Sequence, residues 1–94
     1  MTNEEIKEKY PKVAYVVEVN DKKIYLEQPS RSVVSMTMAK VGRDPLGAYE
    51  DMVNLIAVKE ISDMSILEND DEFISISTQL QNIVEVKKSS MTKL

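Results

Sequence analysis

The sequence contains no cysteine and no histidine. The absence of cysteine excludes disulfide bonds, thiolate metal ligands and cysteine nucleophiles. The absence of histidine removes the commonest general base near neutral pH and the commonest metal ligand. Both absences argue against ordinary catalysis, and we expect a protein that is not an enzyme and has no catalytic residue, no cofactor and no metal site.

Glycine and long apolar runs are also scarce. The chain's two glycines, Gly42 and Gly47, do not form a loop that could cradle a phosphate group. No apolar run approaches the ~18–20 residues that cross a bilayer. Residues 1–7 have neither the basic start nor the apolar stretch of a secretory signal. We therefore expect a cytoplasmic protein with no membrane partner.

The charge is acidic overall and segregated along the chain. The net charge of −4 disfavours a nucleic-acid partner, because an acidic protein repels a phosphate backbone. The segment 44–72 holds nine acidic residues and one basic residue, whereas 29–43 and 73–94 are both net positive. Two interpretations stay open: helix faces whose charges complement one another within the fold, or an acidic surface that faces a basic partner.

The size and the hydrophobic pattern predict one α+β domain. Ninety-four residues with 43% hydrophobic and 30% charged side chains are typical of a small globular protein. We expect a short, charged and loosely held arm at 1–12, a globular domain at 13–88 and a polar tail at 89–94. Within the domain, an N-terminal two-stranded antiparallel β-hairpin at 13–28 packs on a bundle of about three α-helices.

The hairpin has the clearest pattern. Its first strand alternates in hydrophobicity, so one face is expected to carry Val13, Tyr15, Val17 and Val19. Asparagine and aspartate tolerate left-handed backbone angles, so Asn20-Asp21 is the expected turn, which places Val17 opposite Ile24.

The three helices are expected at about 31–42, 45–58 and 71–86. Ser30 and Asp44 are suitable N-caps for the first two, and Gly42 stands at the expected end of the first. Helical spacing predicts that the core is formed in the first helix by Val34, Met38 and Val41, and in the second by Tyr49, Met52, Val53 and Ile56. The segment 57–67 fits neither period, and we expect a frayed helix end followed by a short turn.

Two groups of neighbouring carboxylates are candidates for acid–base chemistry or for holding a divalent cation. Adjacent residues on a helix point in different directions, so Glu50-Asp51 does not form a paired site. The run 70–72 is explained by the preference for acidic residues in the first turn of a helix. Neither group is expected to bind a metal or to catalyse.

Six methionines are a high count for a chain of this length. Methionine fills irregular gaps in a core, and it also forms adaptable binding surfaces. Because Met38 belongs to the expected core stripe, Met36 is the better surface candidate. The expected protein-binding surface lies on the first two helices and comprises Val33, Met36, Met38, Tyr49, Glu50, Asp51, Met52 and Val53.

Several short motifs belong to one further pattern. They are the strand sequences at 13–19 and 23–26, the helix start at 28–31, Asp44-Pro45 followed by Tyr49-Glu50, and the closing segment 83–87. With these motifs the chain resembles the small tail assembly chaperones of tailed phages over 12–94. The resemblance implies a non-enzymatic protein that binds the long, helical tape measure protein while the tail tube polymerises around it, and that is then shed.

The expected partner is therefore a phage tape measure or tail protein, and the chain is also a possible homo-oligomer. Two alternatives stay open. The first is a structural virion or assembly component, in which the uncovered hairpin edge or the helices pack permanently. The second is a small cytoplasmic protein-interaction domain with no role in a phage.

Overall fold

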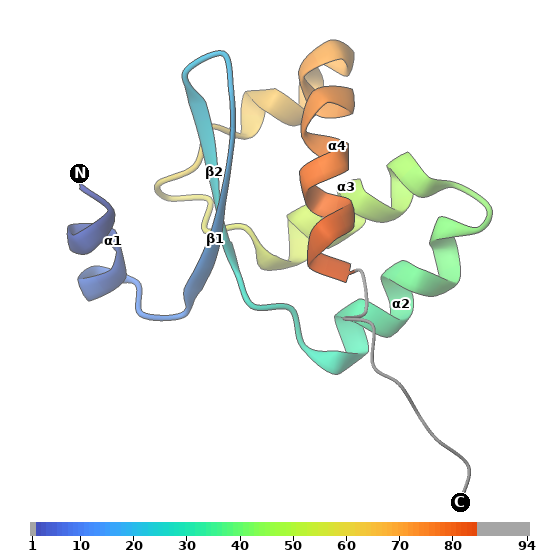
Figure 1. Cartoon of the computed structure of the whole chain (residues 1–94), viewed down its shortest axis with the longest axis horizontal. Helices are drawn as coiled ribbons and strands as arrows, with labels where there is room; N and C mark the ends of the chain where they lie inside the picture. The colour runs from blue at the N-terminus through green and yellow to red at the C-terminus, as the bar shows by residue number, and fades with distance from the viewer. Residues whose placement is uncertain (1, 85–94) are drawn as a thin grey trace, which may run out of the picture.

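The structure is a computed structural model that describes residues 2–84. In chain order the elements are α1 (Asn3–Lys9), β1 (Val13–Val19), β2 (Lys22–Glu27), α2 (Arg31–Val41), α3 (Pro45–Ile56), the short 3-10 helix η1 (Met64–Glu68) and α4 (Asp70–Val84). The fold is the expected α+β arrangement, with an antiparallel hairpin packed on helices (Figure 1). The expected end of the last helix at 86 and the polar tail at 89–94 lie outside the described residues.

The hairpin turn forms at the expected position. Asn20 and Asp21 have positive φ angles of 50° and 65°, as the two central residues of a type I′ turn require. Val17 pairs with Ile24, as the sequence predicts. A two-residue turn of this type matches the twist of its strands, which is why local sequence is enough to set the register here.

A β-bulge at the start of β1 changes the face on which Val13 lies. Val13 pairs with Glu27 and Tyr15 pairs with Leu26, so one extra residue stands between them on β1. The extra residue shifts the alternation by one. The expectation that Val13 shares a face with Tyr15 was wrong: Val13 packs on the opposite face in a small cluster with Ile6 and Tyr25.

This small cluster also holds the N-terminal arm. Ile6 is 3% exposed, and it is the buried residue of α1. Thr2 caps the helix by accepting a hydrogen bond from the backbone N–H of Glu5. The arm is therefore a capped helix docked through one apolar side chain, and not the loosely held segment that its balanced charge suggested.

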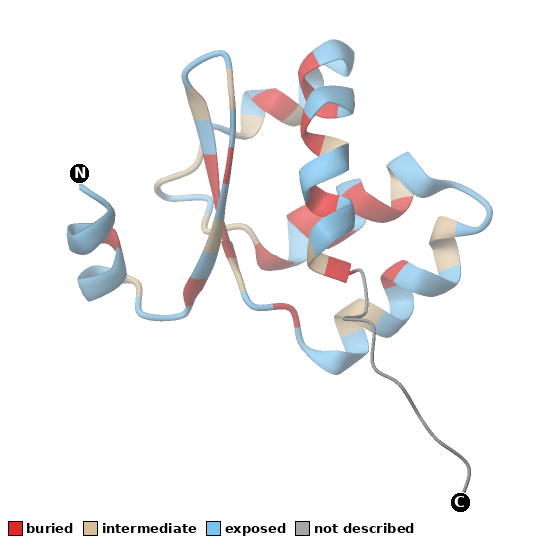
Figure 2. Cartoon of the chain, in the orientation of Figure 1, coloured by how far each residue is buried: buried red, intermediate tan, exposed pale blue. Residues whose placement is uncertain are grey.

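The main core lies between the other face of the hairpin and the helices α3, η1 and α4. Figure 2 shows buried segments on the sides of these elements that face one another. A two-stranded sheet is only marginally stable by itself, so these contacts are what stabilise it. The large side chains that are completely buried are Ile24, Leu26, Met52, Val53, Ile66, Ile76 and Leu80.

The segment after α3 pairs with the hairpin. Ala57 forms an isolated antiparallel bridge with Leu26, and the N–H of Val58 donates to the carbonyl of Tyr25 at 2.8 Å. Farther along, the N–H of Asp63 donates to the carbonyl of Lys23 at 2.8 Å. The expected frayed helix end was wrong, because the backbone leaves α3 in an extended conformation and covers the outer edge of β2.

Helix α2 only partly matches the expected buried face: Val41 packs against the main core as expected, but Met38 does not. Its buried residue is Thr37, 4% exposed, whereas Met38 is 50% exposed. The Thr37 hydroxyl donates to the Val33 carbonyl at 2.8 Å, so its polar group is satisfied without water. Hydrophobic spacing overlooked Thr37 because it treats threonine as polar. The assignment of Met38 to the core was wrong.

A matched pair of substitutions tests this assignment. Met52→Ala removes a completely buried side chain and should lower the free energy of unfolding by about 2–5 kcal/mol. Met38→Ala shortens a side chain that is half exposed and should change it by no more than about 0.5 kcal/mol. Urea unfolding of both variants measures the difference, and equal losses would contradict the burial described above.

Candidate protein-binding surface

Helices α2 and α3 form a hairpin-like pair because a very short connection joins them. α2 begins after Ser30, whose hydroxyl accepts from the N–H of Val33 at 3.2 Å. α3 begins after Asp44, whose carboxylate accepts from the N–H of Gly47 at 3.0 Å. A side chain at position 47 would collide with this carboxylate. The short connection at 42–44 lets α3 double back beside α2 (Figure 1).

An open, mainly apolar groove of about 300 Å³ lies between α2 and α3. Met36 on α2 and Leu55 on α3 line it, and these side chains are 62% and 58% exposed. Apolar side chains this exposed on both helices create a surface that a partner could cover. The full lining consists of Met36, Thr37, Ala39, Lys40, Arg43, Ala48, Asp51, Met52 and Leu55.

The groove lining carries two basic residues, Lys40 and Arg43, and one acidic residue, Asp51, which pairs with Lys40. Lys40 Nζ lies 2.8 Å from Asp51 Oδ2, so the pair joins α2 to α3 across the groove. The hydrogen bond that Lys40 donates to Asp51 is the main reason that the pKa of Lys40 is raised above its usual value. Both side chains are well exposed, at 37% and 60%, so the pair adds little stability. Binding in this groove would therefore depend mainly on apolar contact.

The structure divides the eight expected binding residues into two groups. Met36, Met38, Glu50 and Asp51 are exposed, although Asp51 is engaged by Lys40. The other four contribute to the main core: Val33 is partly buried, and the completely or nearly completely buried residues are Tyr49, Met52 and Val53.

The assignment of Tyr49 and Val53 to a contact surface was therefore wrong, and Met52 reaches the groove only as a fully buried lining residue. The helical stripe that suggested these residues is the stripe that α3 buries against the hairpin and α4. Periodicity identifies a buried face but does not identify what buries it. Met38 is exposed, but it does not line the groove.

Leu55 is the exposed groove-lining residue that sequence reasoning missed. It lies on α3 beside the buried stripe, and neither Leu55 nor the half-exposed Leu46 belongs to that stripe. The sequence did contain a signal for this exposure, because α3 has more apolar residues than one buried face needs. Met36 gives the same signal on α2.

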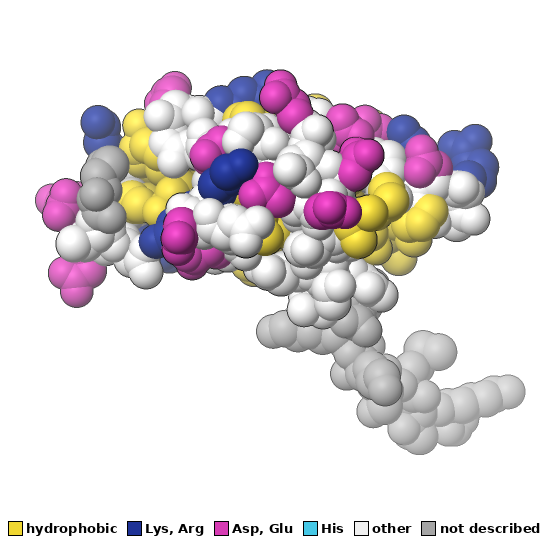
Figure 3. Space-filling model, turned by 90° about the horizontal axis from the view of Figure 1, so that it is seen from above, with side chains coloured by type: hydrophobic (Ala, Val, Ile, Leu, Met, Phe, Trp, Pro, Cys, Tyr) yellow, Lys and Arg dark blue, Asp and Glu magenta, His cyan; other side chains and the backbone are white. Residues whose placement is uncertain are grey.

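Most of the acidic segment serves the fold itself. Asp44 and Asp63 cap α3 and η1, and Glu60 accepts a hydrogen bond from the Tyr10 hydroxyl at 3.1 Å. Seen from above, acidic side chains lie between separate groups of hydrophobic side chains (Figure 3). These contacts favour charge complementarity within the fold, while Glu50 and Glu68 have no ion pair within residues 2–84.

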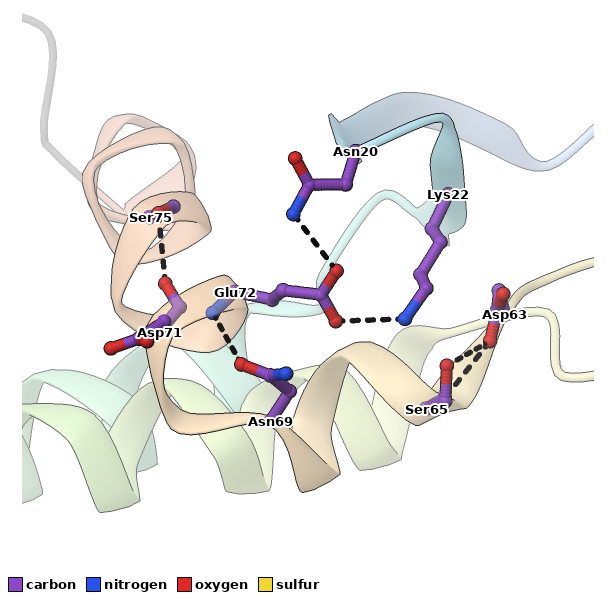
Figure 4. Close-up of polar contacts among 8 residues, drawn as sticks. All are labelled: Asn20, Lys22, Asp63, Ser65, Asn69, Asp71, Glu72 and Ser75. Atoms are coloured by element: carbon purple, nitrogen blue, oxygen red, sulfur yellow. Dashed lines mark hydrogen bonds and ion pairs between the residues drawn. The ribbon is translucent and has the colours of Figure 1, made fainter.

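The one buried carboxylate of the described chain clamps the hairpin turn to α4. Glu72 is 6% exposed and accepts from Lys22 Nζ at 2.9 Å and from Asn20 Nδ2 at 3.1 Å (Figure 4). The hydrogen bond from Lys22 is the main reason that the pKa of Glu72 is lowered, and the same contact raises the pKa of Lys22.

The contacts of this cluster hold the hairpin turn against α4. Within residues 2–84, no buried side-chain nitrogen or oxygen lacks a hydrogen-bond partner. The same part of the chain holds no group of three or more side chains that could ligate a metal ion. Nor does it contain a helix long and apolar enough to cross a membrane. The groove between α2 and α3 thus remains the best candidate site.

The Glu72 clamp predicts a pH-dependent loss of stability in the variant Glu72→Gln. Because the folded-state pKa of Glu72 lies below its unfolded-state value, the stabilisation is complete above the unfolded pKa and is lost as the pH falls through the folded pKa. Glu72→Gln should therefore lower the melting temperature at pH 7, with a difference from the wild type that narrows under acid conditions. Glu68→Gln, at an exposed position, is the control and should show no such trend.

No protein-family model, no curated protein and no solved structure matches the chain.

Proposed function

We propose that the chain is a non-enzymatic protein-binding factor that acts in the host cytoplasm during phage tail assembly, where it chaperones the tape measure protein. The proposal joins the resemblance of its motifs to the small tail assembly chaperones with one structural observation. That observation is the apolar groove between α2 and α3, with Met36 and Leu55 exposed along it.

The partner that fits this groove is an amphipathic helix. A groove between two helices accepts the apolar face of a third, whose anchoring side chains recur every three or four residues. Methionine suits a partner with many such stripes, because its flexible side chain adapts to each of them. A long helical protein that must be kept from aggregating presents stripes of this kind, and its chaperone would cover them.

The exposed acidic residues support the same role. Glu50 on α3 and Glu68 on η1 are exposed, as are Asp70 and Asp71 in the first turn of α4. Together with the net charge of −4, they would keep a complex with an apolar partner from associating further. In this proposal, apolar contact supplies the binding and the acidic surface supplies the solubility.

A double substitution tests the groove. Met36→Lys with Leu55→Lys places two charges along an apolar binding surface and should abolish binding of the tape measure protein, while the melting temperature stays close to that of the wild type. The matched control is Ile74→Lys on α4, where the side chain is 53% exposed and lies outside the groove. Isothermal titration would show normal binding for the control. Equal loss of binding in both variants would contradict the groove as the site.

Affinity capture tests the function directly. The tagged chain is purified from cells that carry its native genome, and the proteins that co-purify are identified by mass spectrometry. We expect a very long helical tail protein in the captured material and no tagged chain in finished particles. Recovery of the chain inside purified particles would instead support a structural component and would overturn the chaperone proposal.

A further inference from the structure

The segment after α3 pairs with one edge of the β-hairpin, and no strand pairs with the other edge within residues 2–84. The outer edge of β2 is covered by the segment after α3, through the backbone bonds from Val58 and Asp63 and through Ser62, whose hydroxyl accepts from the N–H of Tyr25 at 2.9 Å. The outer edge of β1 has no strand beside it within residues 2–84. One edge is thus closed by the chain and the other is open.

The register identifies the backbone groups at the open edge. Tyr25 and Lys23 direct their backbone groups away from β1, toward the segment that covers β2. Their cross-strand partners are Val16 and Glu18. In an antiparallel pair, the members of such a non-hydrogen-bonded pair both point outward. The N–H and C=O groups of Val16 and Glu18 therefore face the open edge, and neither residue forms any other backbone bond within the described chain.

Apolar surface adjoins this edge. Val16 is 44% exposed. Beside it, a groove of about 160 Å³ lies between β1 and α1, lined by Val16, Ala14, Ile6 and Lys7 among others. In Figure 1 the hairpin stands between α1 and α4, so α1 covers part of one face of the sheet. Unpaired backbone groups next to apolar side chains are the features that allow one strand to pair with another.

The charges along the edge are arranged so that a second copy fits in the antiparallel direction. Lys7 and Lys12 lie near the Ala14 end of β1, and Glu18 lies near the other end. Lys23, the charged residue opposite Glu18, is on β2 and therefore away from the edge. Antiparallel pairing about a two-fold axis brings the acidic end of one copy beside the basic end of the other, at both ends of the interface.

From this geometry we infer that the open edge of β1 pairs with β1 of a second copy of the chain. The pairing is centred on Val16 and joins the two hairpins into one four-stranded antiparallel sheet. The bulge at Ala14 leaves the region around Val16 regular, and the opposed Val16 side chains form an apolar cross-strand contact. This inference does not depend on the proposed function.

The variant Val16→Pro tests the backbone pairing. Proline is tolerated in an edge strand where the N–H points outward, so the hairpin should remain intact. The symmetric dimer would lose the hydrogen bond from the Val16 N–H of each copy, which should weaken dimerisation about 10- to 100-fold. Sedimentation equilibrium over a series of concentrations measures the effect. Val16→Thr keeps the N–H and the β-branched shape, and it should still dimerise.

The variant Glu18→Lys tests the charge arrangement. It places a cation beside the basic end of the second copy and should weaken the dimer, whereas the exchange Lys12→Glu with Glu18→Lys should restore it. Circular dichroism confirms that each variant is folded.

Measurements on the wild-type chain test the pairing of β1 even if the proline variant does not fold. Hydrogen exchange at the amides of Val16 and Glu18 should slow as the protein concentration rises. A wild-type chain that sediments as a monomer at every concentration would overturn the inference. A dimer that survives Val16→Pro unchanged, or exchange at these amides that is independent of concentration, would do the same.

Discussion

A two-stranded sheet gains too little from its own hydrogen bonds and cross-strand contacts to be stable alone, and the rest of the molecule covers it. Helices α3 and α4 cover one face, and α1 reaches the other through Ile6. The extended segment from Ala57 covers the edge of β2. The Glu72 clamp joins the turn to α4. The edge of β1 has no strand beside it within residues 2–84.

Covering the hairpin uses only part of the apolar surface of α3, and α2 also keeps apolar side chains exposed. Helix α3 directs Met52, Val53 and Ile56 into the core, so Leu55 is left outside that face. Helix α2 buries little beyond Thr37, and it presents Met36 beside Leu55 along the groove. The small core buries only some of the apolar side chains of α2 and α3, so Met36 and Leu55 remain at the surface and line the groove. A protein that binds apolar helices needs such a surface outside its core, and the proposed chaperone function uses it.

Features determined by neighbouring residues could be predicted from the sequence. The Asn20-Asp21 turn, its register and the helix starts after Ser30 and Asp44 follow from backbone preferences and local caps. Features determined by distant contacts could not. The pairing of Ala57 with Leu26 and the bulge that turns Val13 toward Ile6 depend on residues far apart in sequence.

The candidate surface was only partly predictable, and for the same reason. The exposure of Met36 was expected correctly, because it lies outside the expected stripe of its helix. The assignment of Tyr49 and Val53 to a contact surface was wrong, because the pattern of a buried stripe is the same whether the chain itself or another protein covers it.

The most direct test is the NMR spectrum of the methionine methyl groups with and without the captured tail protein. We expect the Met36 signal to shift on binding and the signal of Met38, which is exposed but outside the groove, to change little. A shift at Met38 with none at Met36 would contradict binding in the groove.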